Sequence, residues 1–143
     1  MGLIKQLYGK KIFLDTAPLI YFMEAESAFM SLLSDLFSPS NNCRFITSVI
    51  TLSEVLVMPL REGKIQLAEQ YKEILTMSEN IHILDINIDI AGEAATIRAN
   101  YSIKTPDAMQ LATAKYGIVD YFLTNDLRLK SFKDLNVITL SDL

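Results

Sequence analysis

The sequence predicts an α/β fold in which a central, mostly parallel sheet of about five strands lies between two layers of helices. Short runs rich in Ile, Val, Phe and Tyr alternate along the chain with longer segments whose apolar residues recur at helical spacing. Strands that alternate with helices form a mostly parallel sheet covered on both faces, which gives a three-layer αβα arrangement. Half of the 143 residues are hydrophobic, and no flexible linker divides them, so we predict a single domain over residues 1–143.

The individual elements follow from these patterns in chain order. Strands are expected at residues 11–15, 44–47, 81–84, 121–123 and 136–139. Helices are expected at residues 28–38, 49–58, 64–78, 89–101 and 106–116. Pro18 suits the first turn of a further helix, and Gly117 is the expected stop of the last helix. Pro59 is expected to kink or end its helix, with a separate short helix near Arg61 as the other outcome.

The rare residue types exclude several kinds of site. One cysteine, Cys43, and one histidine, His82, cannot form a disulfide framework or a zinc site built from cysteine and histidine. His82 lies between isoleucines in a predicted strand and gives little support for a Ser-His-Asp mechanism, and Cys43 is expected to pack as a small hydrophobic residue. The five glycines are too scattered for a phosphate-binding loop. Carboxylate chemistry remains.

The charge and hydropathy of the chain indicate its surroundings. The net charge is -4 and the pI is about 4.9, so no global basic field draws the protein onto nucleic acid. A divalent ion bound in an acidic pocket reverses the local charge, however, so a nucleic-acid substrate is compatible with this composition. The sequence shows no signal-peptide pattern and no apolar run long enough to cross a bilayer, so we expect a cytoplasmic protein without a membrane partner.

Three aspartates stand where strands end or helices begin. Asp15 follows the first predicted strand and Asp126 the fourth, so both are expected at the carboxyl edge of the sheet, where open α/β sheets bind ligands. Asp107 falls in the first turn of a helix, with Thr105 as the expected N-cap and Pro106 at the first helical position. Each aspartate also has a purely structural interpretation, as a helix cap or as a partner of the helix dipole.

Glu54 is harder to explain as a structural residue. If Ser48 caps the helix, Glu54 shares a helix face with the apolar residues Ile50, Val57 and Met58. An uncompensated charge on such a face is costly, and metal coordination is one way to satisfy it. The alternative is a capping box made by Thr51 and Glu54, which requires the helix to start later.

Four clustered carboxylates need a compensating charge. Two carboxylates about 4 Å apart repel by roughly 4 kcal/mol at an effective dielectric of 20. Protons or cations must therefore accompany Asp15, Glu54, Asp107 and Asp126 if they meet. Oxygen ligands without histidine or cysteine favour Mg²⁺ or Mn²⁺, and such ions activate water for the cleavage of a phosphodiester. The pattern predicts a nuclease site.

The sequence resembles the PIN-domain family, and especially its VapC-type toxins from bacterial toxin-antitoxin pairs, over nearly the whole chain. The motifs that carry the resemblance are IFLDTAPLI (12–20), ITSVITLSEVL (46–56), TPDAMQLATA (105–114) and FLTNDLRL (122–129). The resemblance implies a PIN-like αβα fold and cleavage of single-stranded RNA with Mg²⁺ or Mn²⁺. It implies four metal ligands, which are Asp15, Glu54, Asp107 and Asp126, and a supporting hydroxyl from Thr124. It also implies a cognate antitoxin and a homodimer as partners.

Some features depart from the family pattern or leave alternatives open. Many relatives have Arg at the position of Asn125, so a phosphate contact there is in doubt, and Arg128, Lys130 and Lys133 supply it or form a solvated basic face. An antitoxin peptide would suit a groove near four apolar residues that are also core candidates: Tyr21, Phe22, Leu56 and Met58. The competing function is a non-catalytic PIN-like scaffold that binds RNA or protein. A receiver domain and an Asp-nucleophile phosphatase fit poorly, because both need a second acid near Asp15 that is absent.

Overall fold

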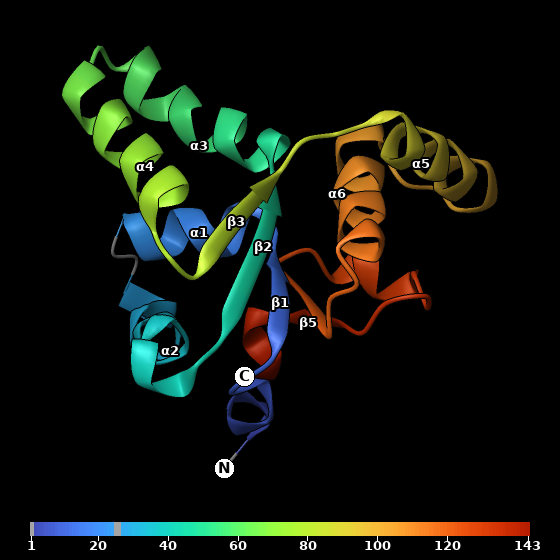
Figure 1. Ribbon diagram of the computed structural model, residues 1–143, viewed down its shortest axis with the longest axis horizontal. Helices are drawn as coiled ribbons and strands as arrows, with labels where there is room; N and C mark the ends of the chain where they lie inside the picture. Colours follow the sequence, from blue (N-terminus) through green and yellow to red (C-terminus); the bar gives the residue numbers. More distant parts are fainter. Residues whose placement is uncertain (1, 25–26) are drawn as a thin grey trace.

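The computed structural model describes residues 2–24 and 27–143 (Figure 1). The strands of the described chain are β1 (Lys11–Leu14), β2 (Arg44–Ser48), β3 (Ile81–Leu84), β4 (Tyr121–Thr124) and β5 (Val137–Thr139). The α-helices are α1 (Thr16–Met23), α2 (Ser27–Phe37), α3 (Val49–Arg61), α4 (Ile65–Met77), α5 (Ile88–Asn100) and α6 (Thr105–Tyr116). Short 3-10 helices are η1 (Leu3–Leu7), η2 (Pro39–Asn41), η3 (Leu127–Ser131) and η4 (Leu140–Asp142).

The five strands form one sheet in the order β3-β2-β1-β4-β5, and every pair of neighbours is parallel. β1 lies at the centre, with Ile12 opposite Phe45 of β2 and Tyr121 of β4. The predicted three-layer α/β fold with a parallel sheet of about five strands is confirmed, and the strand positions agree closely with the sequence pattern.

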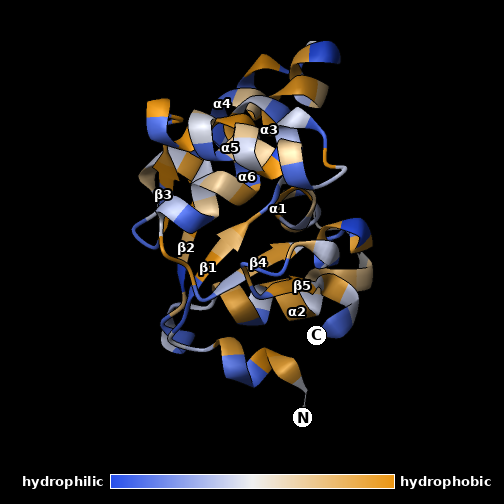
Figure 2. Cartoon of the chain, turned by 90° about the vertical axis from the view of Figure 1, so that its right-hand side faces the viewer, coloured by the Kyte–Doolittle hydropathy of each residue, from blue (hydrophilic) through white to orange (hydrophobic). Residues whose placement is uncertain are grey.

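Side chains alternate across the sheet and divide the core in two. Ile12 and Leu14 of β1 pack into the cluster beneath the helices that precede β3, and Phe13 points to the cluster beneath α5 and α6. Phe13 stacks on Phe122 of β4, with ring centroids 5.0 Å apart. Figure 1 shows the sheet between the two helix layers, and Figure 2 shows the apolar strands enclosed by helices of mixed polarity. Both faces are therefore covered, as a parallel sheet requires.

The strand order reverses between β1 and β4. The chain runs outward from β1 through β2 to β3, and then returns over the opposite face through α5 and α6 to place β4 on the other side of β1. Connections that leave in opposite directions open a crevice beyond the carboxyl ends of the two central strands, which is where open α/β sheets bind ligands. Asp15 and Asp126 follow these two strands.

Local details at three helix ends differ from the sequence prediction. α3 continues through Pro59 to Arg61, because Pro59 is buried and α3 packs along α4, so one lost backbone donor does not end the helix. The N-cap of α6 is Lys104 and not Thr105, which lies inside the helix. Gly117 ends α6 as predicted, but in a right-handed conformation.

No helix within residues 2–24 and 27–143 is both long and apolar enough to cross a membrane.

A matched pair of substitutions in α4 tests the packing of the core. Leu75 is fully buried and Met77 is 78% exposed on the same helix. Leu75→Ala is expected to lower the free energy of unfolding by about 2–5 kcal/mol, because it removes buried methyl groups and leaves a cavity. Met77→Ala is expected to change it by less than about 0.5 kcal/mol. Urea denaturation measures both, and equal losses would contradict this assignment of the buried face.

Candidate active site at the carboxyl edge of the sheet

Asp15 and Asp126 are brought together by the pairing of β1 with β4. The backbone N–H of Asp15 donates to the carbonyl of Leu123 at 2.9 Å, which extends the strand pairing to Asp15. Thr124 ends β4, and its Oγ1 donates to Oδ2 of Asp15 at 2.8 Å and accepts from the backbone N–H of Asp126 at 3.1 Å. One hydroxyl therefore fixes both acidic residues, and it supports Asp15 more directly than it supports the carboxylate of Asp126.

The two aspartates also cap the structures that follow them. Oδ1 of Asp15 accepts from the backbone N–H of Thr16 at the start of α1, at 2.9 Å. Oδ1 of Asp126 accepts from the backbone N–H of Arg128 at the start of η3, at 3.0 Å. The structural and functional interpretations of these residues are thus compatible, because capping uses only part of each carboxylate.

Glu54 reaches the site from α3, but the surroundings differ from the prediction. The helix starts at Val49 with Ser48 as its cap, which decides between the two alternatives and excludes the capping box of Thr51 and Glu54. The apolar face predicted around Glu54 is partly open to solvent, since Glu54 is exposed and Val57 and Met58 on that face are 39% and 49% exposed. Helical spacing reveals an apolar face without showing whether another element covers it.

A threonine links Glu54 to the other acids. Oγ1 of Thr16, the residue after Asp15, donates a short hydrogen bond to Oε1 of Glu54. The same hydroxyl lies 3.4 Å from Oγ1 of Thr51, which is one turn before Glu54 in α3. Thr16, at the start of α1, therefore holds the carboxylate of Glu54 near the end of β1.

Asp107 lies in the first turn of α6, and the charges of the other three carboxylates affect its pKa. Burial raises the pKa of the Asp107 carboxyl above its usual value. The negative charges of Asp15, Asp126 and Glu54 raise this pKa further, and the positive charge of Arg128 lowers it. This combination shows that the four acids share one electrostatic environment.

Arg128 forms an ion pair with one acid of this cluster, Asp126. Its Nη2 donates to Oδ2 of Asp126 at 2.7 Å, and its Nε donates to Oδ1 at 3.0 Å. These hydrogen bonds hold the pKa of the Asp126 carboxyl below its usual value. Lys130, in contrast, pairs with Asp142 at 2.6 Å, so of the three basic residues after Asp126 only Arg128 is shown to contact an acid of the site.

Gln110 is a central residue of the site that sequence reasoning missed. It is 1% exposed, and its Nε2 donates to Oγ1 of Thr51 at 2.7 Å and to Oδ1 of Asp15 at 3.3 Å. Its Oε1 accepts a short hydrogen bond from Oγ of Ser48. The side chain thus joins α6, α3 and β1 in one polar network. A polar residue one turn after Asp107, between Met109 and Leu111, was the available signal.

The oxygen donors of the site suit a hard divalent ion. Within the described ranges, no group of three or more His, Cys, Asp or Glu side chains is already placed to hold a metal ion. Two of the candidate ligands are turned toward other partners, Glu54 toward Thr16 and Asp126 toward Arg128. The charges of Asp15, Asp126 and Glu54 nevertheless contribute to the raised pKa of Asp107, after burial, and an all-oxygen donor set of this kind would favour Mg²⁺ or Mn²⁺.

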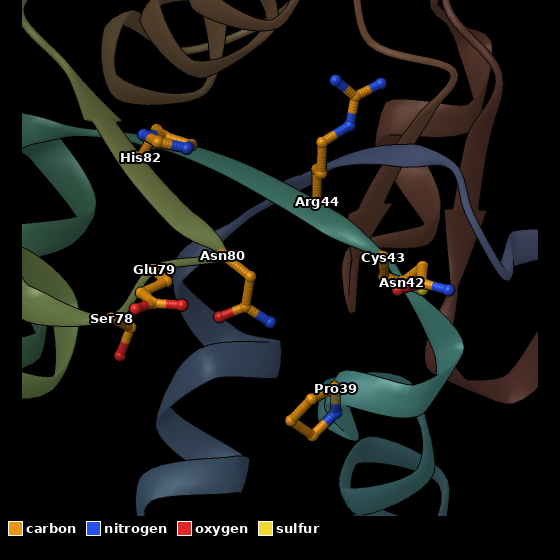
Figure 3. Close-up of a pocket in the computed structure, with 8 residues that line it drawn as sticks. All are labelled: Pro39, Asn42, Cys43, Arg44, Ser78, Glu79, Asn80 and His82. Carbon is orange, nitrogen blue, oxygen red and sulfur yellow. The ribbon is translucent and has the colours of Figure 1, made fainter.

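Two hollows in the surface have different relations to these acids. A small cavity of about 80 Å³ is lined by Asp107 and Asp126, together with Lys104 and Arg128. A hollow of about 710 Å³ lies at the amino ends of β2 and β3 (Figure 3), and its lining residues are Pro39, Asn42, Cys43, Arg44, Ser78, Glu79, Asn80 and His82. None of the candidate metal ligands lines the larger hollow, so the two are separate.

The remaining sequence predictions have mixed outcomes. Cys43 is 3% exposed, its Sγ donates to the carbonyl of Leu7, and burial raises its thiol pKa, as expected of a small hydrophobic residue. Asn125 donates to the hydroxyl of Tyr21 at 3.1 Å. Three of the predicted groove residues pack against the core, namely Tyr21, Phe22 and Leu56, whereas Met58 is 49% exposed.

Comparison with known proteins gives the family of this chain. The family model described as the PIN domain matches residues 12–135, which include all four acids of the site. The chain therefore belongs to the PIN-domain family. A search of curated proteins found no match.

Solved structures share the fold at low sequence identity. A toxin-antitoxin complex from Klebsiella pneumoniae contains a chain that is 23% identical, with a TM-score of 0.71 over 92% of this chain and 99% of that one. VapBC2 from Rickettsia felis, bound to a DNA fragment from its promoter, is 16% identical, with a TM-score of 0.72 over 90% and 98%. The sarcin-ricin loop cleaving toxin VapC20 of Mycobacterium tuberculosis is 18% identical, with a TM-score of 0.64 over 78% and 86%. At these identities the likeness establishes the fold.

Removing the amide of Gln110 tests the polar network. Gln110→Leu leaves the hydroxyls of Ser48 and Thr51 without their buried partner, so the free energy of unfolding is expected to fall by about 1–3 kcal/mol. Gln66→Leu, at an exposed position in α4, is the control and is expected to change it by less than about 0.5 kcal/mol. Urea denaturation measures both, and a Gln110 variant as stable as the control would refute a structural role of the network.

The pH dependence of an Asp107→Asn variant tests the crowding of charge. The raised pKa means that the folded protein resists ionisation of Asp107 more than the unfolded chain does. Folding is therefore penalised above that pKa, and the penalty disappears as the pH falls through it and below about 4, where the unfolded carboxyl is also protonated. In buffer with EDTA at pH 7, Asp107→Asn is expected to raise the Tm by roughly 2–4 °C.

Thermal unfolding followed by circular dichroism from pH 7 to pH 4 measures this effect. The difference in Tm between the variant and the native protein should shrink steadily as the pH falls. A lower Tm for Asp107→Asn at pH 7 would instead identify Asp107 mainly as a stabilising partner of the α6 dipole.

Proposed function

We propose that this protein is a divalent-metal-dependent endoribonuclease that cleaves single-stranded RNA. The observation that carries the proposal is the gathering of acids at the carboxyl edge of the sheet: the hydroxyls of Thr16 and Thr124 hold Glu54 and Asp15, and Asp107 and Asp126 line one small cavity. Natural proteins rarely crowd like charges without a cation or proton to compensate them, and such crowding concentrates at functional sites. The position of the cluster, at the reversal of strand order, is that of ligand sites in open α/β sheets.

Asp15, Glu54, Asp107 and Asp126 are the residues that would hold Mg²⁺ or Mn²⁺. When bound, the ion activates water and stabilises the negative charge that develops as a phosphodiester is cleaved. Thr124 and Gln110 orient the carboxylate of Asp15 through hydrogen bonds to its two oxygens. Thr16 does the same for Glu54. Burial and the charges of the neighbouring acids both raise the pKa of Asp107, and a bound cation would offset the part that comes from those charges.

The biological role that we propose is that of a toxin restrained by a cognate antitoxin protein. Membership of the PIN-domain family supports this role, together with the fold shared with chains of toxin-antitoxin complexes. One of the similar structures is described as a toxin that cleaves the sarcin-ricin loop, which is consistent with RNA as the substrate. A cytoplasmic location accords with such a substrate. We also propose a homodimer, for which the exposed side chains of Val57, Met58 and Leu60 on α3 provide apolar surface.

Cleavage of single-stranded RNA tests the proposal. The native protein should cut RNA with Mg²⁺ or Mn²⁺ and lose this activity with EDTA. Asp15→Asn and Asp107→Asn should each lose more activity than the roughly 10- to 100-fold that substitution of a supporting residue costs at metal sites. The products are resolved on denaturing gels, and circular dichroism verifies that each variant is folded.

Asp89→Asn is the matched control for Asp107→Asn. Asp89 is also an aspartate in the first turn of a helix, but it is exposed on α5 and is not among the charges that shift the pKa of Asp107. Its substitution should leave cleavage unchanged. Cleavage that persists in EDTA or in both site variants would refute the metal mechanism. A folded native protein that binds RNA without cleaving it would favour the non-catalytic scaffold.

A further inference from the structure

The carboxylate of Asp126 is subject to two competing demands. As a metal ligand it must offer an oxygen to an ion, but both of its oxygens already accept hydrogen bonds from Arg128. Nε of Arg128 donates to Oδ1 at 3.0 Å, and Nη2 donates to Oδ2 at 2.7 Å. A guanidinium that occupies both oxygens competes with any ion that binds there.

The pair is built so that it can be broken without disturbing the fold. The side chain of Arg128 is 77% exposed and that of Asp126 is 28% exposed, and ion pairs in contact with water are weak. The backbone N–H of Arg128 also donates to Oδ1 of Asp126, at 3.0 Å. This third hydrogen bond caps η3, and it does not depend on where the guanidinium lies.

A displaced guanidinium has an anionic ligand to meet nearby. Arg128 and Lys104 line the same small cavity as Asp107 and Asp126, so two positive groups border two of the candidate metal ligands. Lys104 is exposed at the amino end of α6. The planar guanidinium of arginine is well matched to phosphate oxygens. A backbone phosphate of RNA at the cavity would therefore find donors beside the cleavage site.

The other nearby basic residues are less suited to this role. Lys130 pairs with Asp142 at 2.6 Å. Lys133 is exposed farther along the chain and does not line the cavity. Asn125 donates to the hydroxyl of Tyr21 and carries no charge. Of the basic residues of this segment, Arg128 is thus the one that contacts an acid of the site and lines the cavity.

We propose that Arg128 is a substrate-positioning residue whose guanidinium is bound by Asp126 in the absence of an ion. Ion binding to Asp126 releases the guanidinium, which then binds a backbone phosphate of RNA beside Lys104. This inference rests on the proposed metal-dependent nuclease function. It makes two effects of Arg128 opposite in sign: Arg128 weakens ion binding and strengthens RNA binding once the ion is present.

Titration of the full-length protein with Mn²⁺, followed by isothermal calorimetry, tests the first effect. Arg128→Ala should bind Mn²⁺ about three- to fivefold more tightly than the native protein, because the ion no longer displaces a surface ion pair. Lys130→Ala is the control, since it removes the same charge from the same segment but contacts Asp142. Its affinity should equal that of the native protein. Equal affinities in Arg128→Ala and the native protein would overturn the proposal.

Fluorescence anisotropy with a short single-stranded RNA tests the second effect, with Ca²⁺ as the ion and the integrity of the RNA checked on gels. With Ca²⁺, Arg128→Ala should bind RNA about three- to tenfold more weakly. The plot of log affinity against log salt concentration should also become less steep, by the amount that corresponds to about one phosphate contact. With EDTA the difference between Arg128→Ala and the native protein should be smaller. An equal loss in Ca²⁺ and EDTA would reveal a general charge effect and overturn the release of Arg128.

The outcomes separate this inference from the function on which it rests. If the native protein binds no divalent ion, both the metal mechanism and the role of Arg128 fail. If the native protein binds ion and cleaves RNA but Arg128→Ala matches it in both titrations, only the role of Arg128 fails. Circular dichroism of each variant excludes unfolding as the cause of a lost affinity.

Discussion

The parallel pairing of β1 with β4 is the constraint on which the candidate site depends. It places Asp15 beside Thr124 through the hydrogen bond from the Asp15 backbone to Leu123, although more than a hundred residues separate the two strands in sequence. The same pairing defines the reversal of strand order that opens the crevice. α1, α3 and α6 contribute further polar side chains to the same edge from their first two turns.

Each of three acids accepts hydrogen bonds from a different set of side chains, which offsets part of the repulsion among the acids. Asp15 accepts from threonine and glutamine side chains, Glu54 from Thr16, and Asp126 from Arg128. Asp107, inside the first turn of α6, has a pKa raised by burial and, to a lesser extent, by the charges of the other acids. The cluster is thus neither a set of independent helix caps nor a rigid chelate. Its side chains have partners of their own in the absence of an ion and enough shared charge to attract one.

The sequence predicts the architecture well because its signals are local. Burial on both faces makes the strands short apolar runs, and Gly117 marks the end of α6 from its immediate context. The contacts of Gln110 with Ser48 and Asp15 join residues far apart in the chain, and no local pattern encodes such a pairing. The surroundings of Glu54 were mispredicted for a related reason: helical spacing gives a face, but only tertiary packing decides whether that face is covered.

The double use of Asp15 and Asp126, as helix caps and as candidate ion ligands, has a consequence for how such a protein can change. Asparagine caps a helix about as well as aspartate does, yet it carries no charge to attract a cation. If these residues hold the ion of the proposed nuclease, exchange of one carboxylate oxygen for an amide nitrogen would therefore remove the activity and keep the helix caps. Under that proposal, loss of activity and loss of fold would be separable at these two positions, and an inactive protein with this fold could arise by a single substitution.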